Sequence, residues 1–188
     1  TYDKETLKNG FTVVDIGAHV GLYAMLVAEK VGNTGKIIAI EPAPINYKRL
    51  QENIAINDFK NVIAVKMALS DHTGQEKLYL PLRSTCNSLN LNLVSSQKNI
   101  PFVEVKVNTL DDLLKNLNVK KVDIIKIDAE GAEMPILRGA KNTLKNNPDV
   151  IVLVASYHYQ GEVEEVQSFL HNMGFNTKVS AFDIVITI

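Results

Sequence analysis

The feature that most constrains the fold is a glycine turn between a short apolar segment and a helical one. Residues 11–16 are mainly β-branched and apolar, which predicts a buried strand. Residues 20–31 carry apolar side chains at helical spacing, and Gly17 and Gly21 lie at the junction of the two segments. Glycines at such a turn let the backbone approach a ligand closely at the edge of a parallel sheet. The segment therefore predicts a strand–turn–helix unit that opens an α/β sheet.

The alternation of strands and helices continues along the chain. Further strands are predicted at residues 36–41, 62–68, 122–128 and 150–155, and helices at 45–57, 110–117, 133–145 and 162–173. Residues 76–82 and 102–107 alternate as exposed antiparallel strands, a small β insertion after the third strand. Residues 175–180 and 182–188 can pair as a C-terminal antiparallel hairpin. The pattern predicts one doubly wound α/β domain over residues 1–188.

One long segment has no predicted secondary structure. Residues 84–99 are rich in Ser and Asn and lie within the β insertion. A loop of this length in a compact domain is usually functional or mobile. We expect it to contribute to substrate specificity, together with the exit of the strand at 150–155.

Composition and charge narrow the function classes. The 188 residues carry 20 basic and 21 acidic side chains, so no basic excess indicates a nucleic-acid partner. The apolar runs are too short to cross a bilayer, and no signal peptide is visible. The lone Cys86 excludes an internal disulfide, and a cytoplasmic location is expected. The chain begins at Thr1 rather than Met, which leaves room for a missing N-terminal segment.

Two acids at predicted strand ends point to a particular kind of cofactor. Asp15 precedes the glycine turn, where a carboxylate would repel a pyrophosphate and favour a cationic group, such as the amino group or sulfonium of S-adenosylmethionine. Glu41 ends the second strand, where it can accept hydrogen bonds from both ribose hydroxyls. The pair favours S-adenosylmethionine over a dinucleotide; the alternative is that the two acids only cap their strands.

Five ordered motifs carry a family resemblance. They are Asp15-Ile16-Gly17-Ala18-His19-Val20-Gly21-Leu22-Tyr23, Glu41-Pro42, Ala68-Leu69-Ser70-Asp71, Thr109-Leu110-Asp111 and Ile125-Lys126-Ile127-Asp128-Ala129-Glu130-Gly131-Ala132-Glu133. In this order, over about residues 10–154, the chain resembles the FkbM-type methyltransferases. The resemblance implies the class I methyltransferase fold, with a seven-stranded sheet that ends in a reversed hairpin. It also implies methyl transfer from S-adenosylmethionine, commonly to a hydroxyl of a small molecule, sugar or natural product.

The resemblance also implies where the cofactor lies. Expected cofactor contacts are Asp15, Gly17, Ala18, His19, Gly21, Leu22 and Tyr23 at the methionine portion, Glu41 and Pro42 at the ribose, Met67, Ala68 and Asp71 at the adenine, and Asp128 facing the methyl donor. His19 stands where the family usually has Asn. The strand at 150–155 continues into Tyr157 and His158 without the Glu that often precedes the family's His.

Acidic residues after the strand at 122–128 are the candidates for catalysis. The sulfonium donor is already activated, so the protein must position the acceptor and remove its proton. Because neighbouring acids shift one another's pKa, we assign Glu130 as general base and Asp128 as the group that holds the donor or the acceptor hydroxyl. His158 is the second candidate base, and Glu133 is equally well explained as a helix cap.

Several alternatives remain open from the sequence. A divalent cation on the acidic residues is less favoured, because the strand at 150–155 supplies no second carboxylate, and no metal ligand is assigned. The leading function is O-methylation of a small molecule or sugar. An RNA methyltransferase, an NAD-dependent oxidoreductase and a catalytically inactive cofactor-binding module are the competing functions; oligomeric state is not predicted.

Overall fold

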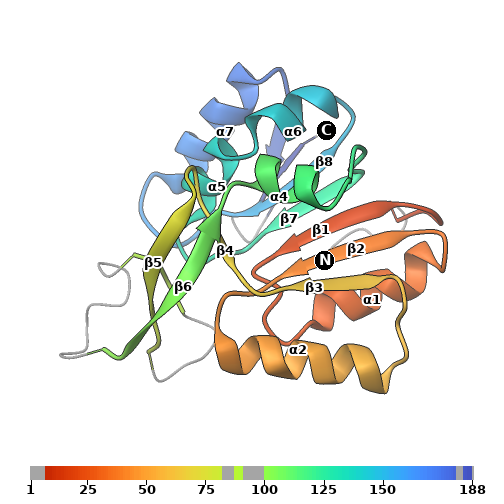
Figure 1. Ribbon diagram of the computed structural model, residues 1–188. Coiled ribbons are helices and arrows are strands. Elements are labelled where there is room, and N and C mark those ends of the chain that lie inside the picture. The colour runs from red at the N-terminus through yellow and green to blue at the C-terminus, as the bar shows by residue number, and fades with distance from the viewer. Residues whose placement is uncertain (1–6, 82–86, 91–99, 181–183, 188) are drawn as a thin grey trace.

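The central sheet of the computed structural model has seven strands in the order β3-β2-β1-β7-β8-β10-β9 (Figure 1). The structure describes residues 7–81, 87–90, 100–180 and 184–187. The strands are β1 (Thr12–Ile16), β2 (Lys36–Ile40), β3 (Val62–Val65), β7 (Ile124–Ile127), β8 (Ile151–Ala155), β9 (Thr177–Val179) and β10 (Ile184–Thr187). All pairings from β3 to β8 are parallel, and β10 is antiparallel to both β8 and β9. The predicted mostly parallel sheet with a C-terminal antiparallel hairpin is confirmed.

Helices cover both faces of this sheet (Figure 1). One face packs against α1 (Leu22–Val31) and α2 (Pro44–Ile56), and the other against α4 (Leu110–Asn116), α5 (Glu133–Arg138), α6 (Lys141–Asn146) and α7 (Glu162–Asn172). Successive residues of a strand point to opposite faces, so Val13 packs on the α1 side and Val14 on the α4 side. Both faces of the inner strands are thereby buried, which explains their unbroken apolar sequences.

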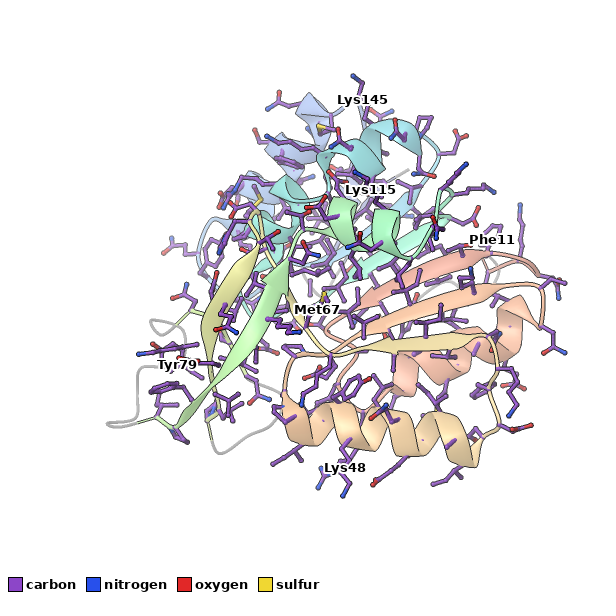
Figure 2. All side chains as sticks on the ribbon, in the orientation of Figure 1. Phe11, Lys48, Met67, Tyr79, Lys115 and Lys145 are labelled. Atoms are coloured by element: carbon purple, nitrogen blue, oxygen red, sulfur yellow. The ribbon has the colours of Figure 1, made fainter. Side chains whose placement is uncertain are left out.

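The predicted third strand is divided between two sheets. β3 ends at Val65, and β4 (Ala68–Leu69) belongs to a small sheet with β5 (Gly74–Tyr79) and β6 (Phe102–Asn108) in the order β4-β6-β5. The chain leaves the large sheet because Ala68 and Leu69 pair with β6 instead. Met67 lies in this connection, between the large sheet and the β5–β6 pair (Figure 2). The small β insertion is confirmed, although β5 begins two residues earlier than predicted.

Part of the predicted loop can be placed. Residues 84–86 and 91–99 lie outside the described residues, as do 182, 183 and 188 of the predicted hairpin. Residues 87–90 return to the small sheet, where the backbone groups of Tyr79 and Ser88 hydrogen bond in both directions. The buried Ser88 therefore lies beside the end of β5.

The single helix predicted at 133–145 is wrong, because the structure has two short helices there, α5 and α6. Between them, Gly139 lies so close to the segment after β4 that a Cβ atom would be 2.1 Å from the carbonyl oxygen of Ser70. The carbonyl oxygen of Gly139 accepts a hydrogen bond from the N–H of Asp111 in α4. This tertiary hydrogen bond takes the place of the helical one, which ends α5.

The approach at Gly139 leads to a stability prediction. Gly139→Ala is expected to lower the free energy of unfolding by about 1–3 kcal/mol, because the added methyl group must displace backbone atoms. Chemical denaturation monitored by circular dichroism measures the change. Gly74→Ala is the matched control, since a Cβ there meets nothing closer than 4.0 Å. Equal stability of both variants would contradict the close approach at Gly139.

Candidate cofactor and active site

A cavity of about 390 Å³ opens at the carboxyl ends of β1, β2 and β7. The side of the cavity away from these strands is formed by the small sheet and by residues 87–90. Its lining residues are Ile16, Gly17, Ala18, His19, Leu22, Tyr23, Ile40, Glu41, Pro42, Asn46, Met67, Ala68, Leu69, Leu78, Asn87, Leu89, Lys126, Asp128, Ala129, Glu130, Ala132, Ile136 and Tyr157. Open α/β sheets bind ligands at this edge, and the volume lies within the range of small-molecule sites.

The glycine turn is fixed to its neighbours by backbone contacts. Gly17 has φ +75°, and a Cβ there would lie 1.9 Å from the carbonyl oxygen of Asp128, so only glycine fits. The N–H groups of Gly17 and Ala18 both donate to the carbonyl oxygen of Ile40. These two N–H groups therefore join the turn to β2. His19 also has a positive φ of 53°, which positions its N–H toward Glu41.

Glu41 lies on the cavity wall with its carboxylate held in place from three sides. Its Oε2 accepts a hydrogen bond from the His19 N–H (2.9 Å), and its Oε1 accepts from the Ala43 N–H (3.0 Å) and the Asn46 amide (3.4 Å). Burial raises the pKa of Glu41, and these donors oppose the rise. A carboxylate has four acceptor positions, so one remains for a ligand hydroxyl.

Asp15 is not on the cavity wall. It is fully buried and pairs in register with Lys126 of β7, whose Nζ lies 3.1 Å from Oδ1 of Asp15. The same Nζ donates to the carbonyl oxygen of Gly17 and lies 3.6 Å from Oδ2 of Asp128. The structure therefore presents Lys126, not Asp15, at the cavity, and the direct effect of the Asp15 charge on a ligand was overestimated. Asp15 instead compensates the buried Lys126.

An acidic turn forms the opposite end of the wall from Glu41. Asp128 and Glu130 follow β7, and the hydroxyl of Tyr157 donates to Oδ1 of Asp128 at 3.2 Å. Burial raises the pKa of Glu130, and the neighbouring Asp128 adds to the rise, whereas His158 opposes it. Glu130 and Gly131 both have positive φ angles, 52° and 92°. The turn thus carries a half-buried carboxylate whose pKa lies above its ordinary value.

His158 lies behind Glu130 and not on the wall. Its Nε2 is 3.8 Å from Oε2 of Glu130, and its side chain is 5% exposed. From the sequence, His158 is the second candidate for the base that acts on the acceptor. The structure does not bring His158 to the cavity, so Glu130 is the only one of these two candidates in position to contact a ligand.

Part of the cavity wall is apolar. Met67, Ala68, Leu69, Leu78 and Leu89 line it from the connection after β3 and from the small sheet. Next to Leu89, the hydroxyl of Ser88 donates to the carbonyl oxygen of Glu130 at 2.6 Å. This bond links residues 87–90 directly to the acidic turn.

Most of the predicted cofactor residues meet at this cavity, but Asp15, Gly21 and Asp71 do not line it. Gly21 has φ +90° at the start of α1, where a Cβ would be 2.5 Å from Leu50. Asp71 is bonded at 2.9 Å to Arg138, which holds the pKa of its carboxyl below the ordinary value. Gly21 therefore serves packing, and Asp71 an ion pair.

Several wall residues were not predicted from the sequence, which are Ile16, Ile40, Asn46, Leu69, Leu78, Asn87, Leu89, Lys126, Ala129, Ala132 and Ile136. Lys126 carried a usable signal, because a lysine within the apolar strand Ile124–Ile127 needs a buried partner. Leu78, Asn87 and Leu89 come from the small sheet and from residues 87–90, whose placement depends on the two sheets meeting, which no local pattern predicts.

The sheet order, with a cavity at its reversal point, is that of a class I S-adenosylmethionine-dependent methyltransferase. The family model of the methyltransferase FkbM domain matches residues 15–177. The chain belongs to this family, as the sequence motifs predicted, and it is a methyltransferase.

Relatives and solved structures agree with this assignment. Methyltransferase sdnD of Sordaria araneosa is 28% identical, with 93% of this chain and 77% of the relative covered. Hexuronic acid methyltransferase AglP of Haloferax volcanii is 26% identical, with 88% of this chain and 64% of the relative covered. The crystal structure of methyltransferase FkbM from Methylobacillus flagellatus superposes with a TM-score of 0.70 at 16% identity, over 99% of this chain and 46% of that chain. This chain thus spans less than half of that protein. No helix in the described part of the chain is long and apolar enough to cross a membrane.

Proposed function

We propose that this chain transfers a methyl group from S-adenosylmethionine to a hydroxyl group of a small molecule or sugar, and that residues 1–188 act as one methyltransferase domain. The observation that carries the proposal is the arrangement of one cavity. A fixed carboxylate, Glu41, follows β2, Asp128 and Glu130 follow β7 on the other side of β1, and apolar side chains complete the wall of the same cavity. A ribose needs a fixed acceptor, an adenine an apolar cover and a reacting hydroxyl a nearby base, and the cavity offers all three.

The chemistry of the wall residues suits the parts of S-adenosylmethionine. Glu41 would accept a ribose hydroxyl at its remaining acceptor position, with Pro42 beside it. Met67 and Ala68 would cover the adenine, and the residues from Gly17 to Tyr23 the methionine portion. Lys126 and Asp128 together offer one cation and one anion for the carboxylate and amino groups of the methionine portion. Asp15 would act on the cofactor only through Lys126.

The acidic turn supplies what the chemistry requires. The methyl group moves to the acceptor oxygen as the carbon–sulfur bond breaks, and the hydroxyl proton passes to Glu130. The raised pKa of Glu130 brings it nearer to that of a useful general base. Asp128, fixed by the Tyr157 hydroxyl, would orient the donor or the acceptor.

The relatives support a small acceptor. AglP is by its name a hexuronic acid methyltransferase, so a sugar acid is a first acceptor to test. The net charge of −1 gives no support to RNA as the acceptor, and the family assignment leaves no support for an NAD-dependent oxidoreductase. A divalent cation remains the less favoured addition to the site, and the cytoplasmic location remains a prediction from the sequence.

Transfer of radiolabelled methyl from S-adenosylmethionine tests the proposal. A panel of hexuronic acids, neutral sugars, hydroxylated aromatic compounds and total RNA would serve as acceptors, with the labelled product identified by mass spectrometry. We expect an O-methylated small molecule. Label in RNA alone, with binding that weakens steeply as salt rises, would replace this function by RNA methylation. Cofactor binding without transfer to any acceptor would support the inactive module.

The ribose contact gives a separate prediction. Glu41→Ala is expected to weaken S-adenosylhomocysteine binding about tenfold or more, because charge-assisted hydrogen bonds to the ribose are lost. Isothermal titration calorimetry measures the affinity. Glu29→Ala, an exposed acid of α1, is the control for lost charge. Unchanged affinity in Glu41→Ala would remove Glu41 from the cofactor site.

A further inference from the structure

Three buried titratable side chains lie behind Glu130, and the proposed reaction does not use them directly. Glu133 begins α5, His158 follows β8, and Glu162 begins α7. The side chains of both glutamates are completely buried, and that of His158 is 5% exposed. None of the three lines the cavity. Buried charges of this kind are costly unless they compensate one another.

In each of the two glutamates, one carboxyl oxygen accepts a hydrogen bond from the described residues and the other does not. Glu133 Oε1 accepts from the Ala129 N–H at 2.7 Å, and Glu162 Oε2 accepts from the His158 N–H at 2.8 Å. The imidazole Nδ1 lies 3.5 Å from Glu133 Oε1 and 3.4 Å from Glu162 Oε2. The other two oxygens accept from no donor in the part of the chain that the structure describes. The two carboxyl groups can satisfy each other only if one of them carries a proton.

The surroundings shift the pKa values of the three side chains in different directions. Burial raises the pKa of Glu133 to about 8, which places the proton on Glu133 at neutral pH. Burial acts on Glu162 in the same direction, but hydrogen bonds from His158 outweigh it and hold the pKa of Glu162 below the ordinary value. Burial would lower the pKa of His158, but the hydrogen bond with Glu162 and the acidic side chains around the ring outweigh it and raise that pKa. These directions favour the neutral form of Glu133, the anionic form of Glu162 and the cationic form of His158.

The second nitrogen of this cation faces the proposed base. His158 Nε2 lies 3.8 Å from Glu130 Oε2, and the ring also stacks beside Tyr157, which bonds to Asp128. We propose that His158 is a positioning residue for Glu130: one proton shared by Glu133 and Glu162 keeps the imidazole cationic, and its Nε2 orients and stabilises the ionised Glu130 carboxylate. This inference rests on the proposed role of Glu130 as general base.

The arrangement gives Glu130 a neighbour that favours its ionised form. Burial and Asp128 both favour the protonated form of Glu130, and His158 is the group that opposes them. Glu133 also fixes the turn that carries Glu130, through its bond to the Ala129 N–H. Removal of the imidazolium would let the pKa of Glu130 rise further, and the base would become protonated at higher pH.

The charge state is tested first, by NMR titration of the imidazole in the full chain, with His158→Gln used to assign the signal. We expect His158 to remain cationic at pH 7.5. Glu133→Gln should leave this charge in place, because its amide can donate to Glu162 as the protonated acid does. The double variant Glu133→Gln/Glu162→Gln should lose it, with His158 neutral at pH 7. Thermal unfolding confirms that each variant is folded. A neutral His158 in the parent chain at pH 7 would overturn the proposal.

The effect on Glu130 is tested second, by the pH profile of kcat for the acceptor found above. In His158→Gln the acidic limb should move up by about one pH unit or more, since an opposite charge at this distance shifts a pKa by that much. Affinity for S-adenosylhomocysteine should not change, and His171→Gln, an exposed histidine of α7, should behave as the parent chain. An unmoved limb would refute the positioning role.

Two further outcomes can be distinguished from the results of the NMR titration and of the pH profile. Oxygens of Asp128 and Glu130 and a nitrogen of His158 lie within 4.8 Å of one another. Stoichiometric Mn²⁺ binding that His158→Gln abolishes would overturn the proposal, because Nε2 would then be a metal ligand. Absence of methyl transfer to every acceptor would defeat the proposed function, whereas the NMR titration would still decide the charge of His158.

Discussion

Glu130→Gln is expected to lower kcat by about 10²–10⁴-fold, the usual contribution of a general base. The amide is nearly the same shape as the carboxylate but cannot accept the proton of the acceptor hydroxyl. The carbonyl oxygen of Glu130, to which Ser88 donates, is unchanged, so the turn should keep its conformation. Radiolabelled methyl transfer under saturating cofactor measures the effect.

The control separates chemistry from binding. S-adenosylhomocysteine affinity of Glu130→Gln should equal that of the parent chain, and Glu104→Gln, an exposed acid of β6, should have full activity. Full turnover by Glu130→Gln would show that another group accepts the proton. A loss of cofactor affinity in proportion to the lost activity would instead assign Glu130 to donor binding.

Lys126→Met is expected to lower the free energy of unfolding by about 3–5 kcal/mol at neutral pH, the usual cost of removing one partner of a buried ion pair. Asp15 is fully buried, and Lys126 lies next to it in register on the neighbouring strand. Without the ammonium group, the Asp15 carboxylate is left uncompensated inside the sheet. Equilibrium urea denaturation measures the loss, and the exposed Lys36→Met is the matched control.

The pH dependence of this loss has a definite sign. Burial raises the pKa of Asp15 above its ordinary value, and Lys126 opposes the rise. A group with a raised pKa in the folded state contributes stability at low pH that is lost as pH rises through that pKa. Removal of Lys126 raises the pKa of Asp15 further, so the stability gap between parent and variant should be wider at pH 8 than at pH 5.

A second substitution checks the cause. Asp15→Asn in the Lys126→Met background should recover part of the stability, because no uncompensated charge remains. Two results would show that Lys126 acts through packing rather than through charge. One is a double variant as unstable as Lys126→Met, and the other is a stability difference between parent and Lys126→Met that narrows as pH rises.

The fold could be predicted because its signals are local. Periodicity along the chain identified most of the strands and helices. Gly17 marked the turn, because only glycine fits its conformation and its contact with Asp128. The helix over 133–145 was mispredicted because the hydrogen bond that ends α5 comes from Asp111, in a different element. Such a bond has no trace in the local pattern.

For the site, Glu41, Asp128 and Glu130 were predictable because each follows a strand, and the carboxyl ends of parallel strands meet at one edge. The sequence by itself thus determined which segments form the sheet and which acids approach its edge, since both follow from residue type and spacing along the chain. Only the tertiary structure decided that Lys126 covers Asp15 and that His158 lies behind Glu130, between Glu133 and Glu162. These contacts join residues from separate elements, and their distances depend on strand register and helix packing rather than on any local pattern.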